Sequence, residues 1–169
     1  MNNNKYWKRR LDSQVATIEA YHHHLDLRSI DGLDDEGLTY LLNNVKGVNM
    51  LDLNETEIIN ESIRLLTRLE YVKELRLKGF RIDNGCMADL DKLTGLEFLH
   101  LKDTGVTIDG LLQLKNLSNL KELMFSADNV DSIRGKMLQL KQQLPECAFA
   151  VNSKPWNFDE FSPPSGGYS

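Results

Sequence analysis

The chain has 169 residues, of which 41% are hydrophobic and 27% are charged, with only 4 Pro and 2 Cys. This length suits one domain with a sizeable core, and the composition excludes a wholly disordered chain, a collagen-like fibre and a disulfide-stapled miniprotein. The formal net charge of -5 does not favour a general nucleic-acid binder. Leucine supplies 28 residues, an excess that indicates a coiled coil, a membrane span or a repeat with leucine at fixed positions.

The sequence carries no recognisable targeting or membrane signal. No apolar stretch of signal-peptide length follows the basic start of the chain, and no run approaches the roughly 18 apolar residues of a membrane span. Cys86 and Cys147 are far apart and have no close Cys or His partner, which argues against a zinc site or a disulfide framework. We expect a cytoplasmic protein with two free thiols and with no metal, cofactor or membrane partner.

A helix is expected at residues 5–20. Trp7, Leu11, Val15 and Ile18 recur at steps of four, four and three residues, the stripe of an amphipathic helix. Together with the segment that follows, this helix defines an N-terminal region at residues 1–24. Its expected role is to cap the structure that comes next.

Three consecutive histidines, His22–His24, lie at the end of this region. On a strand, His22 and His24 share a face with Asp26, and two imidazoles with a carboxylate are ligands that zinc or nickel accepts. No fourth ligand is identifiable. The favoured interpretation is therefore solvent-facing histidines, and no metal site is assigned.

A period of 24 residues runs through the middle of the chain. The pattern Leu-x-Leu recurs at Leu51–Leu53, Leu75–Leu77 and Leu99–Leu101, continues as Leu123–Phe125, and has outlying copies at Leu25–Leu27 and Phe149–Val151. Seven positions into each central unit stands another apolar residue: Ile58, Ile82, Val106 and Val130. A heptad coiled coil is excluded because glycines interrupt the pattern and the spacing is not 3.5. The leucine excess therefore belongs to a repeat.

Each unit predicts a short strand, a turn and a short helix. Alternation places both leucines of Leu-x-Leu on one face of a strand, and Asn60, Asn84 and Asp109 are residue types that cap the start of a helix. One unit cannot bury its own apolar side, so we expect stacked units with strand beside strand and helix beside helix. The repeat domain is expected at residues 25–152, with about six parallel strands.

Residues 25–152 resemble a leucine-rich repeat solenoid of the short, helix-bearing type, similar to ribonuclease-inhibitor-like arrays. The units are similar to the bacterial variant L-x-L-x-x-T-x-[IV]-x-D-x-G-L: Thr56 and Thr104 stand at the inner ladder position, and Asp34–Leu38 and Ile108–Leu111 stand at the helix start. The ladder pattern is broken at Ile30, Phe80 and Asp128. The resemblance implies an α/β horseshoe with a parallel sheet on the concave face and short helices on the convex face. It carries little information about function.

The C-terminal residues 153–169 are expected to lack regular structure, because prolines and glycines crowd this tail. Trp156, Phe158 and Phe161 are nevertheless too apolar for an idle linker. We expect them to fold back over the last repeat. Docking of this aromatic-acidic tail on another molecule is the alternative.

The residues beside the strand leucines point away from the core and line up as columns across a parallel sheet. The middle of this face combines basic, aromatic and methionine side chains, a composition typical of interaction surfaces. The candidate partner-binding residues are Met50, Asp52, Arg76, Lys78, Phe98, His100, Lys102 and Met124. Their basic cluster favours a protein partner with an acidic surface, whereas ordinary solvation of a repeat surface is the alternative interpretation.

Signatures of catalysis are missing from the sequence. His100 has no nucleophile or orienting carboxylate at the equivalent positions of the neighbouring strands, Cys86 has no nearby histidine, and no phosphate-binding glycine loop occurs. We therefore expect a non-catalytic module that binds a protein on its concave face, with an inhibitor or immunity protein as one version. The alternative is a structural scaffold subunit that assembles through its ends and tail, and a metal-dependent or thiol enzyme ranks last.

Overall fold

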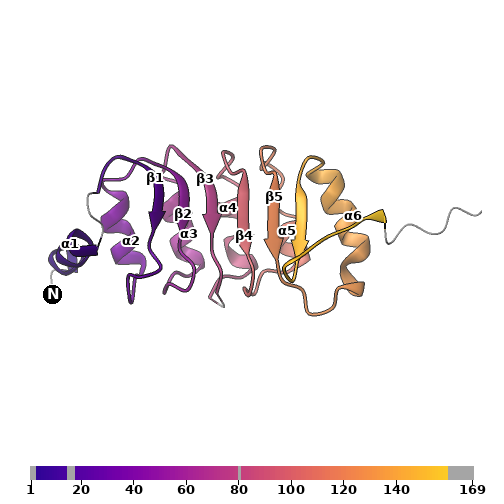
Figure 1. Ribbon diagram of the computed structural model, residues 1–169, viewed down its shortest axis with the longest axis horizontal. Helices are drawn as coiled ribbons and strands as arrows, with labels where there is room; N and C mark the ends of the chain where they lie inside the picture. Colours follow the sequence, from indigo (N-terminus) through magenta and orange to yellow (C-terminus); the bar gives the residue numbers. More distant parts are fainter. Residues whose placement is uncertain (1–2, 15–17, 80, 160–169) are drawn as a thin grey trace, which may run out of the picture.

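The computed structural model describes residues 3–14, 18–79 and 81–159. Within these ranges the protein is α/β, and a sheet of seven strands alternates with helices along the chain (Figure 1). The strands are β1 (Tyr21–Asp26), β2 (Gly47–Asp52), β3 (Tyr71–Arg76), β4 (Phe98–Leu101), β5 (Glu122–Phe125), β6 (Ala148–Val151) and β7 (Lys154–Pro155). The helices are α1 (Asn3–Gln14), α2 (Asp35–Leu42), α3 (Asn60–Leu66), η1 (Asn84–Cys86), α4 (Met87–Leu90), α5 (Ile108–Leu111), η2 (Asp131–Ile133) and α6 (Arg134–Gln143).

The strands lie side by side in the order of the sequence. β1 to β6 pair in parallel, and β7 pairs antiparallel with β6. Leu75 aligns with Leu51 on one side and with Leu99 on the other, and Leu99 aligns with Leu123. The predicted period of 24 residues is thus the register between neighbouring strands. Each unit is named below by its strand, so that the β3 unit runs from β3 to the start of β4.

The helices between the strands lie behind one face of the sheet (Figure 1). The opposite face carries the outward side chains of β1 to β6 and of the residues that follow each strand, and we call it the open sheet face. None of the helices in the described ranges is long and apolar enough to cross a membrane.

The repeated apolar positions build one continuous core between the sheet and the helices. Leu51, Leu75, Leu99 and Leu123 are all fully buried, because alternation along each strand turns them toward the helix side. The second residue of each pair, including Phe125, is buried as well. A single unit has too little apolar surface to achieve this, so the core exists only where units stack.

Val130 departs from the predicted packing. Its counterparts Ile58, Ile82 and Val106 are buried, whereas Val130 is 36% exposed. The side chain of Asn129 accepts hydrogen bonds from the backbone N–H groups of the two residues that follow Val130, so a helical turn starts early and Val130 already has helical backbone angles. The expectation that Val130 repeats the packing of Ile58 is therefore wrong.

The turns after the strands depend on side-chain hydroxyls at the predicted ladder position. Thr56 Oγ1 donates a hydrogen bond to the carbonyl of Leu53 at 2.8 Å, and Thr104 Oγ1 donates to the carbonyl of Leu101 at 2.7 Å. Ile30 has no hydroxyl at this position and is buried instead, while its backbone N–H bonds to the carbonyl three residues earlier. Phe80 lies outside the described residues.

The predicted helix caps at Asn60, Asn84 and Asp109 are wrong. These residues lie inside their helices, and the extended residue that precedes each helical segment stands one or two positions earlier. The Asn60 side chain bonds to Asp83, and the Asn84 side chain bonds to Thr107, so each amide joins its unit to the next. Residues with capping chemistry are thus used here for lateral contacts.

The helix α1 covers the N-terminal end of the helix layer. Trp7 and Leu11 are buried, and α1 packs against α2. Gly37 of α2 allows this approach, since a Cβ there would lie 2.8 Å from the indole ring of Trp7. α1 ends at Gln14, short of the predicted helix at 5–20, and Val15 lies outside the described residues.

The C-terminal segment folds back on the last repeat, as predicted. Trp156 and Phe158 pack against the core, and the Phe158 ring meets Phe149 edge-on at 6.1 Å between centroids. The expectation of no regular structure is wrong for Lys154–Pro155, because these residues pair with β6. Phe161 lies outside the described residues.

Candidate functional site

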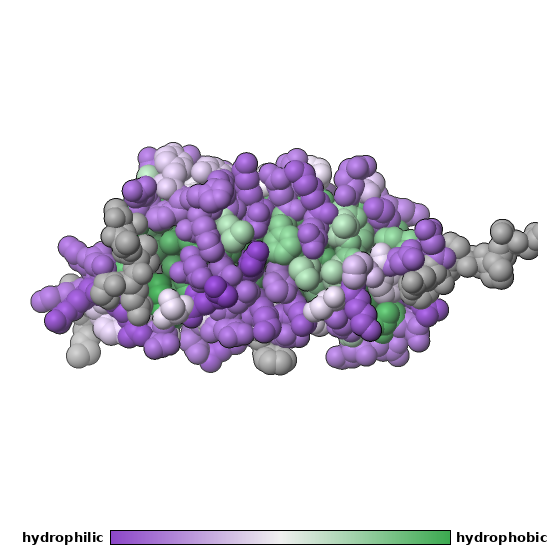
Figure 2. Space-filling view, in the orientation of Figure 1, coloured by the Kyte–Doolittle hydropathy of each residue, from purple (hydrophilic) through white to green (hydrophobic). Residues whose placement is uncertain are grey.

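All eight residues predicted to bind a partner lie on the open sheet face. Asp52, Arg76, His100 and Met124 occupy successive positions of one row across β2 to β5, and Met50 and Phe98 lie in the row beside it. Lys78 and Lys102 follow the same strands. Seen from this side, hydrophobic surface runs along the middle of the face between hydrophilic margins (Figure 2).

Three side chains at the centre of the face contact one another. The guanidinium of Arg76 lies 5.5 Å from the centroid of the Phe98 ring, a distance at which a cation is attracted to an aromatic face. The His100 ring meets Phe98 edge-on at 6.4 Å between centroids. All three residues are half-buried. We call Arg76, Phe98 and His100 the central cluster.

Asp52 differs from the expectation of an exposed acidic neighbour. It occupies the predicted row, but its side chain is only 2% exposed. Arg28 Nε lies 3.5 Å and Arg76 Nη1 lies 3.9 Å from its Oδ2, and its Oδ1 accepts the backbone N–H of Asn54 at 3.1 Å. A buried carboxylate requires such partners. Asp52 therefore holds the two arginines in place and is not accessible to a partner.

The basic side chains of the face are partly neutralised by neighbours that the sequence argument missed. Lys78 Nζ lies 3.1 Å from Glu55 and 3.9 Å from Asp103. Both acids stand in the turns just after a strand and have positive φ angles of 61° and 57°. Lys102 has no ion pair within the described ranges and is half-buried. The uncompensated positive charge of the predicted basic cluster thus lies mainly at Lys102.

Two nitrogen atoms of the central cluster are buried without a hydrogen-bond partner among the described residues. They are Nε of Arg76 and Nε2 of His100. Leaving a buried polar group unpaired costs about 1–3 kcal/mol. A bound molecule that supplies hydrogen-bonding groups at these two atoms recovers part of that cost.

The ionisation of His100 gives a direct test of this arrangement. Burial, together with the nearby charges of Arg76, Lys102 and Lys78, lowers the pKa of His100 below its ordinary value of 6.5. The unfolded state then takes up a proton at a higher pH than the folded state, so His100 makes the fold less stable as the pH falls below about 6.5. We expect the NMR titration midpoint of His100 to lie below that of histidine in an unstructured peptide.

Replacing Arg76 by methionine is expected to raise this midpoint, because the substitution removes a nearby cation and uncovers Asp52. Lys115→Met removes a cation from an exposed position in the turn before β5 and is expected to leave the midpoint unchanged. A midpoint in the native protein at or above that of the peptide would contradict the described geometry.

The remaining residues singled out from the sequence do not join this cluster. Cys86 and Cys147 are free and buried, and burial raises the pKa of each thiol to about 12. His22 accepts the backbone N–H of Glu19, and His23 lies within hydrogen-bond distance of Asn49. Within the described part of the chain, no group of three or more His, Cys, Asp or Glu side chains is placed to hold a metal ion.

Fold and site together define an α/β protein of repeated strand–helix units with a mixed aromatic, apolar and basic sheet face. Neither a protein family model nor a curated protein matches its sequence.

Proposed function

We propose that this protein is a non-catalytic leucine-rich repeat module that binds a partner protein on the open sheet face, the concave side of a horseshoe. The central cluster carries this proposal. It joins an aromatic ring, a guanidinium and an imidazole at half-buried positions, and two of its nitrogens have no hydrogen-bond partner among the described residues. Aromatic and Arg side chains that are mostly desolvated contribute most strongly to protein interfaces.

Three features of the fold support the leucine-rich repeat assignment. Neighbouring strands are related by 24 residues, Thr56 and Thr104 close the turns after their strands, and Asp34 caps α2 by accepting the N–H groups of Glu36 and Gly37. All three fall at the positions that the repeat pattern specifies. The buried thiols fit a reducing cytoplasm.

The partner that fits this face best presents a carboxylate beside an apolar contact. Lys102 supplies a positive charge, and the Nε–H of Arg76 supplies a donor that lacks an acceptor among the described residues. Met50 and Met124 add half-buried apolar area on either side of the central cluster. A partner with an acidic surface, for example an enzyme whose active site is covered by an inhibitor or immunity protein, meets these requirements.

The test is capture of partner proteins by two matched double variants. Lys102→Glu with Met124→Glu reverses the charge in the middle of the open sheet face and spares the arginines that cover Asp52. Lys115→Glu with Leu138→Glu makes the same change of charge at exposed positions outside that face. Proteins captured by the native chain and identified by mass spectrometry are expected to remain with the second variant and to fall at least tenfold with the first. Equal capture by both variants would refute the proposal.

The scaffold alternative depends on residues that the fold already uses. Trp156 and Phe158 pack against the core of their own chain, and Trp7 is 4% exposed. These aromatic groups are therefore engaged within the chain, which favours binding through the open sheet face. The alternative predicts that the two glutamate double variants behave alike and that assembly depends on residues 153–169.

A further inference from the structure

A cleft opens between the β4 unit and the β5 unit, beyond the carboxyl ends of these two strands. Its volume is about 480 Å³, which lies within the range of small-ligand sites. The loops after β4 and β5 and the helical segments that follow them form its walls. This position is distinct from the open sheet face, so the inference below does not rest on the proposed function.

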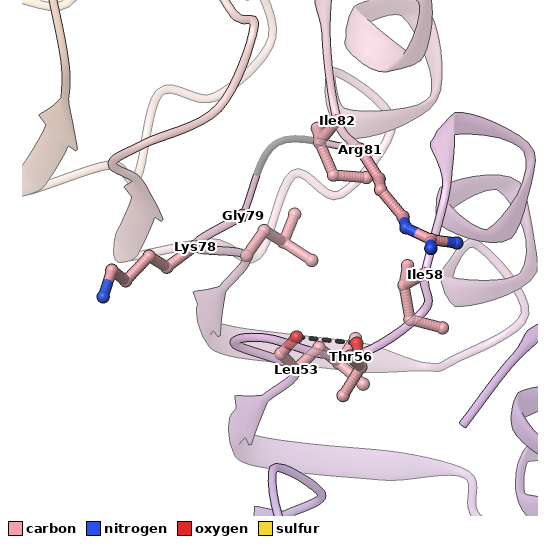
Figure 3. A pocket seen from close by; sticks show the side chains of 8 residues that line it. Leu53, Thr56, Ile58, Lys78, Gly79, Arg81 and Ile82 are labelled. Carbon is pink, nitrogen blue, oxygen red and sulfur yellow. Dashed lines mark hydrogen bonds between the residues drawn. The ribbon is translucent and has the colours of Figure 1, made fainter. Parts of the chain in front are cut away.

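The equivalent junction two repeats earlier is almost closed. Between the β2 and β3 units the corresponding cavity measures about 30 Å³. Ile58 and Ile82 line this space, Thr56 bonds to the carbonyl of Leu53, and the ammonium group of Lys78 points away (Figure 3). Both isoleucines are 3% exposed. The repeat itself therefore does not produce a cleft of ligand size.

The cleft results from a local change in the β5 unit. Val106 corresponds to Ile58 and stays buried, but Val130 corresponds to Ile82 and is turned out of the core. The cause is the early helical turn that starts at Asn129, whose side chain accepts two backbone N–H groups. Ile133 is buried in the helical segment that follows, and the space that Ile82 occupies in its own unit remains open here.

The lining of the cleft combines an apolar floor with a charged rim. Val106, Ile108 and Ile133 are buried apolar residues of the lining. At the rim, Lys136 Nζ lies 2.7 Å from the carboxylate of Asp109. Asp128 has no ion pair within the described ranges, so the rim carries one uncompensated negative charge.

From this lining we infer that the cleft binds an alkylammonium group, either the lysine side chain of a bound protein or a free polyamine. The methylene chain of such a group lies along the apolar floor, and its cationic end meets Asp128 and Asp109 at the rim. An anion is disfavoured because two carboxylates face it, and an uncharged apolar ligand leaves Asp128 without a partner.

The experiment measures binding by NMR titration of the full chain with three probes. Nα-acetyl-lysine-N-methylamide and spermidine carry the cation, and Nα-acetyl-norleucine-N-methylamide is the uncharged analogue of the first. We expect saturable shifts at Val106 and Ile133 with both cations and at least about threefold weaker binding of the norleucine compound. Tighter binding of spermidine identifies a free polyamine as the source, and tighter binding of the lysine compound identifies a protein side chain.

Three variants with opposite expected effects complete the test. Asp128→Asn is expected to weaken binding of the lysine compound about threefold to fivefold. Lys136→Gln frees Asp109 and is expected to strengthen it by a similar factor, while Asp131→Asn, outside the lining and paired with Arg134, leaves it unchanged. No saturable shift with either cation, or equal binding by the native chain and the Asp128 and Lys136 variants, would overturn the inference.

Discussion

Replacing Leu99 by alanine is expected to lower the free energy of unfolding by about 2–5 kcal/mol. Leu99 is fully buried and lies in register between Leu75 and Leu123 in the middle of the sheet. The substitution removes apolar contacts and leaves a cavity between units that cannot collapse without disturbing the strands on both sides. For a chain of this length the melting temperature falls by roughly 5–15 °C.

The control for this prediction is Leu138→Ala. Leu138 is 57% exposed on α6, and a surface substitution of this kind changes stability by only about 0.5 kcal/mol. Chemical denaturation of both variants, followed by circular dichroism, separates the two effects. Similar losses at the two positions would mean that the stacked leucines do not form the continuous core described above.

Replacing Trp7 by alanine is expected to cost about 3–5 kcal/mol and to release α1 from the end of the helix layer. Trp7 is 4% exposed, and its indole ring lies against Gly37 of α2. Because α1 covers the first unit, its loss also exposes apolar side chains of α2 to water. Hydrogen exchange should show faster exchange in α1 and α2 and little change in β4 and β5.

Two further variants make this prediction specific. Tyr6→Ala removes a neighbouring aromatic side chain that is 53% exposed on the same helix, and we expect a loss below about 1 kcal/mol. Gly37→Ala normally stabilises a helix by about 1 kcal/mol, but here the new methyl group would meet the Trp7 ring and Leu33, so we expect destabilisation. A gain in stability for Gly37→Ala would show that α1 does not pack as described.

Most of the fold could be predicted from the leucines alone. Their spacing of 24 residues specified the parallel register, because every unit presents the same two apolar positions to its neighbours. The strand boundaries were less accessible. β1, β2 and β3 begin about four residues before their first leucine, since backbone pairing with the neighbouring strand extends beyond the alternating pattern.

The candidate site was predictable in position but not in charge. The repeat placed Arg76, His100 and Met124 in one row, because register follows from the period. Which side chains are buried or paired depends on contacts across strands. Asp52 is covered by arginines from both sides, and Lys78 is paired with acids from two different turns.

The sequence by itself thus determined the repeat, the strand register and the face on which each outward residue lies. These properties depend on periodicity, and periodicity is a property of the chain. The tertiary structure decided how the outward residues pair with one another and where the repeat opens into a cleft. A single local competition, the early helical turn that Asn129 initiates, turns Val130 out of the core, and only the packing of two neighbouring units converts that change into a cavity.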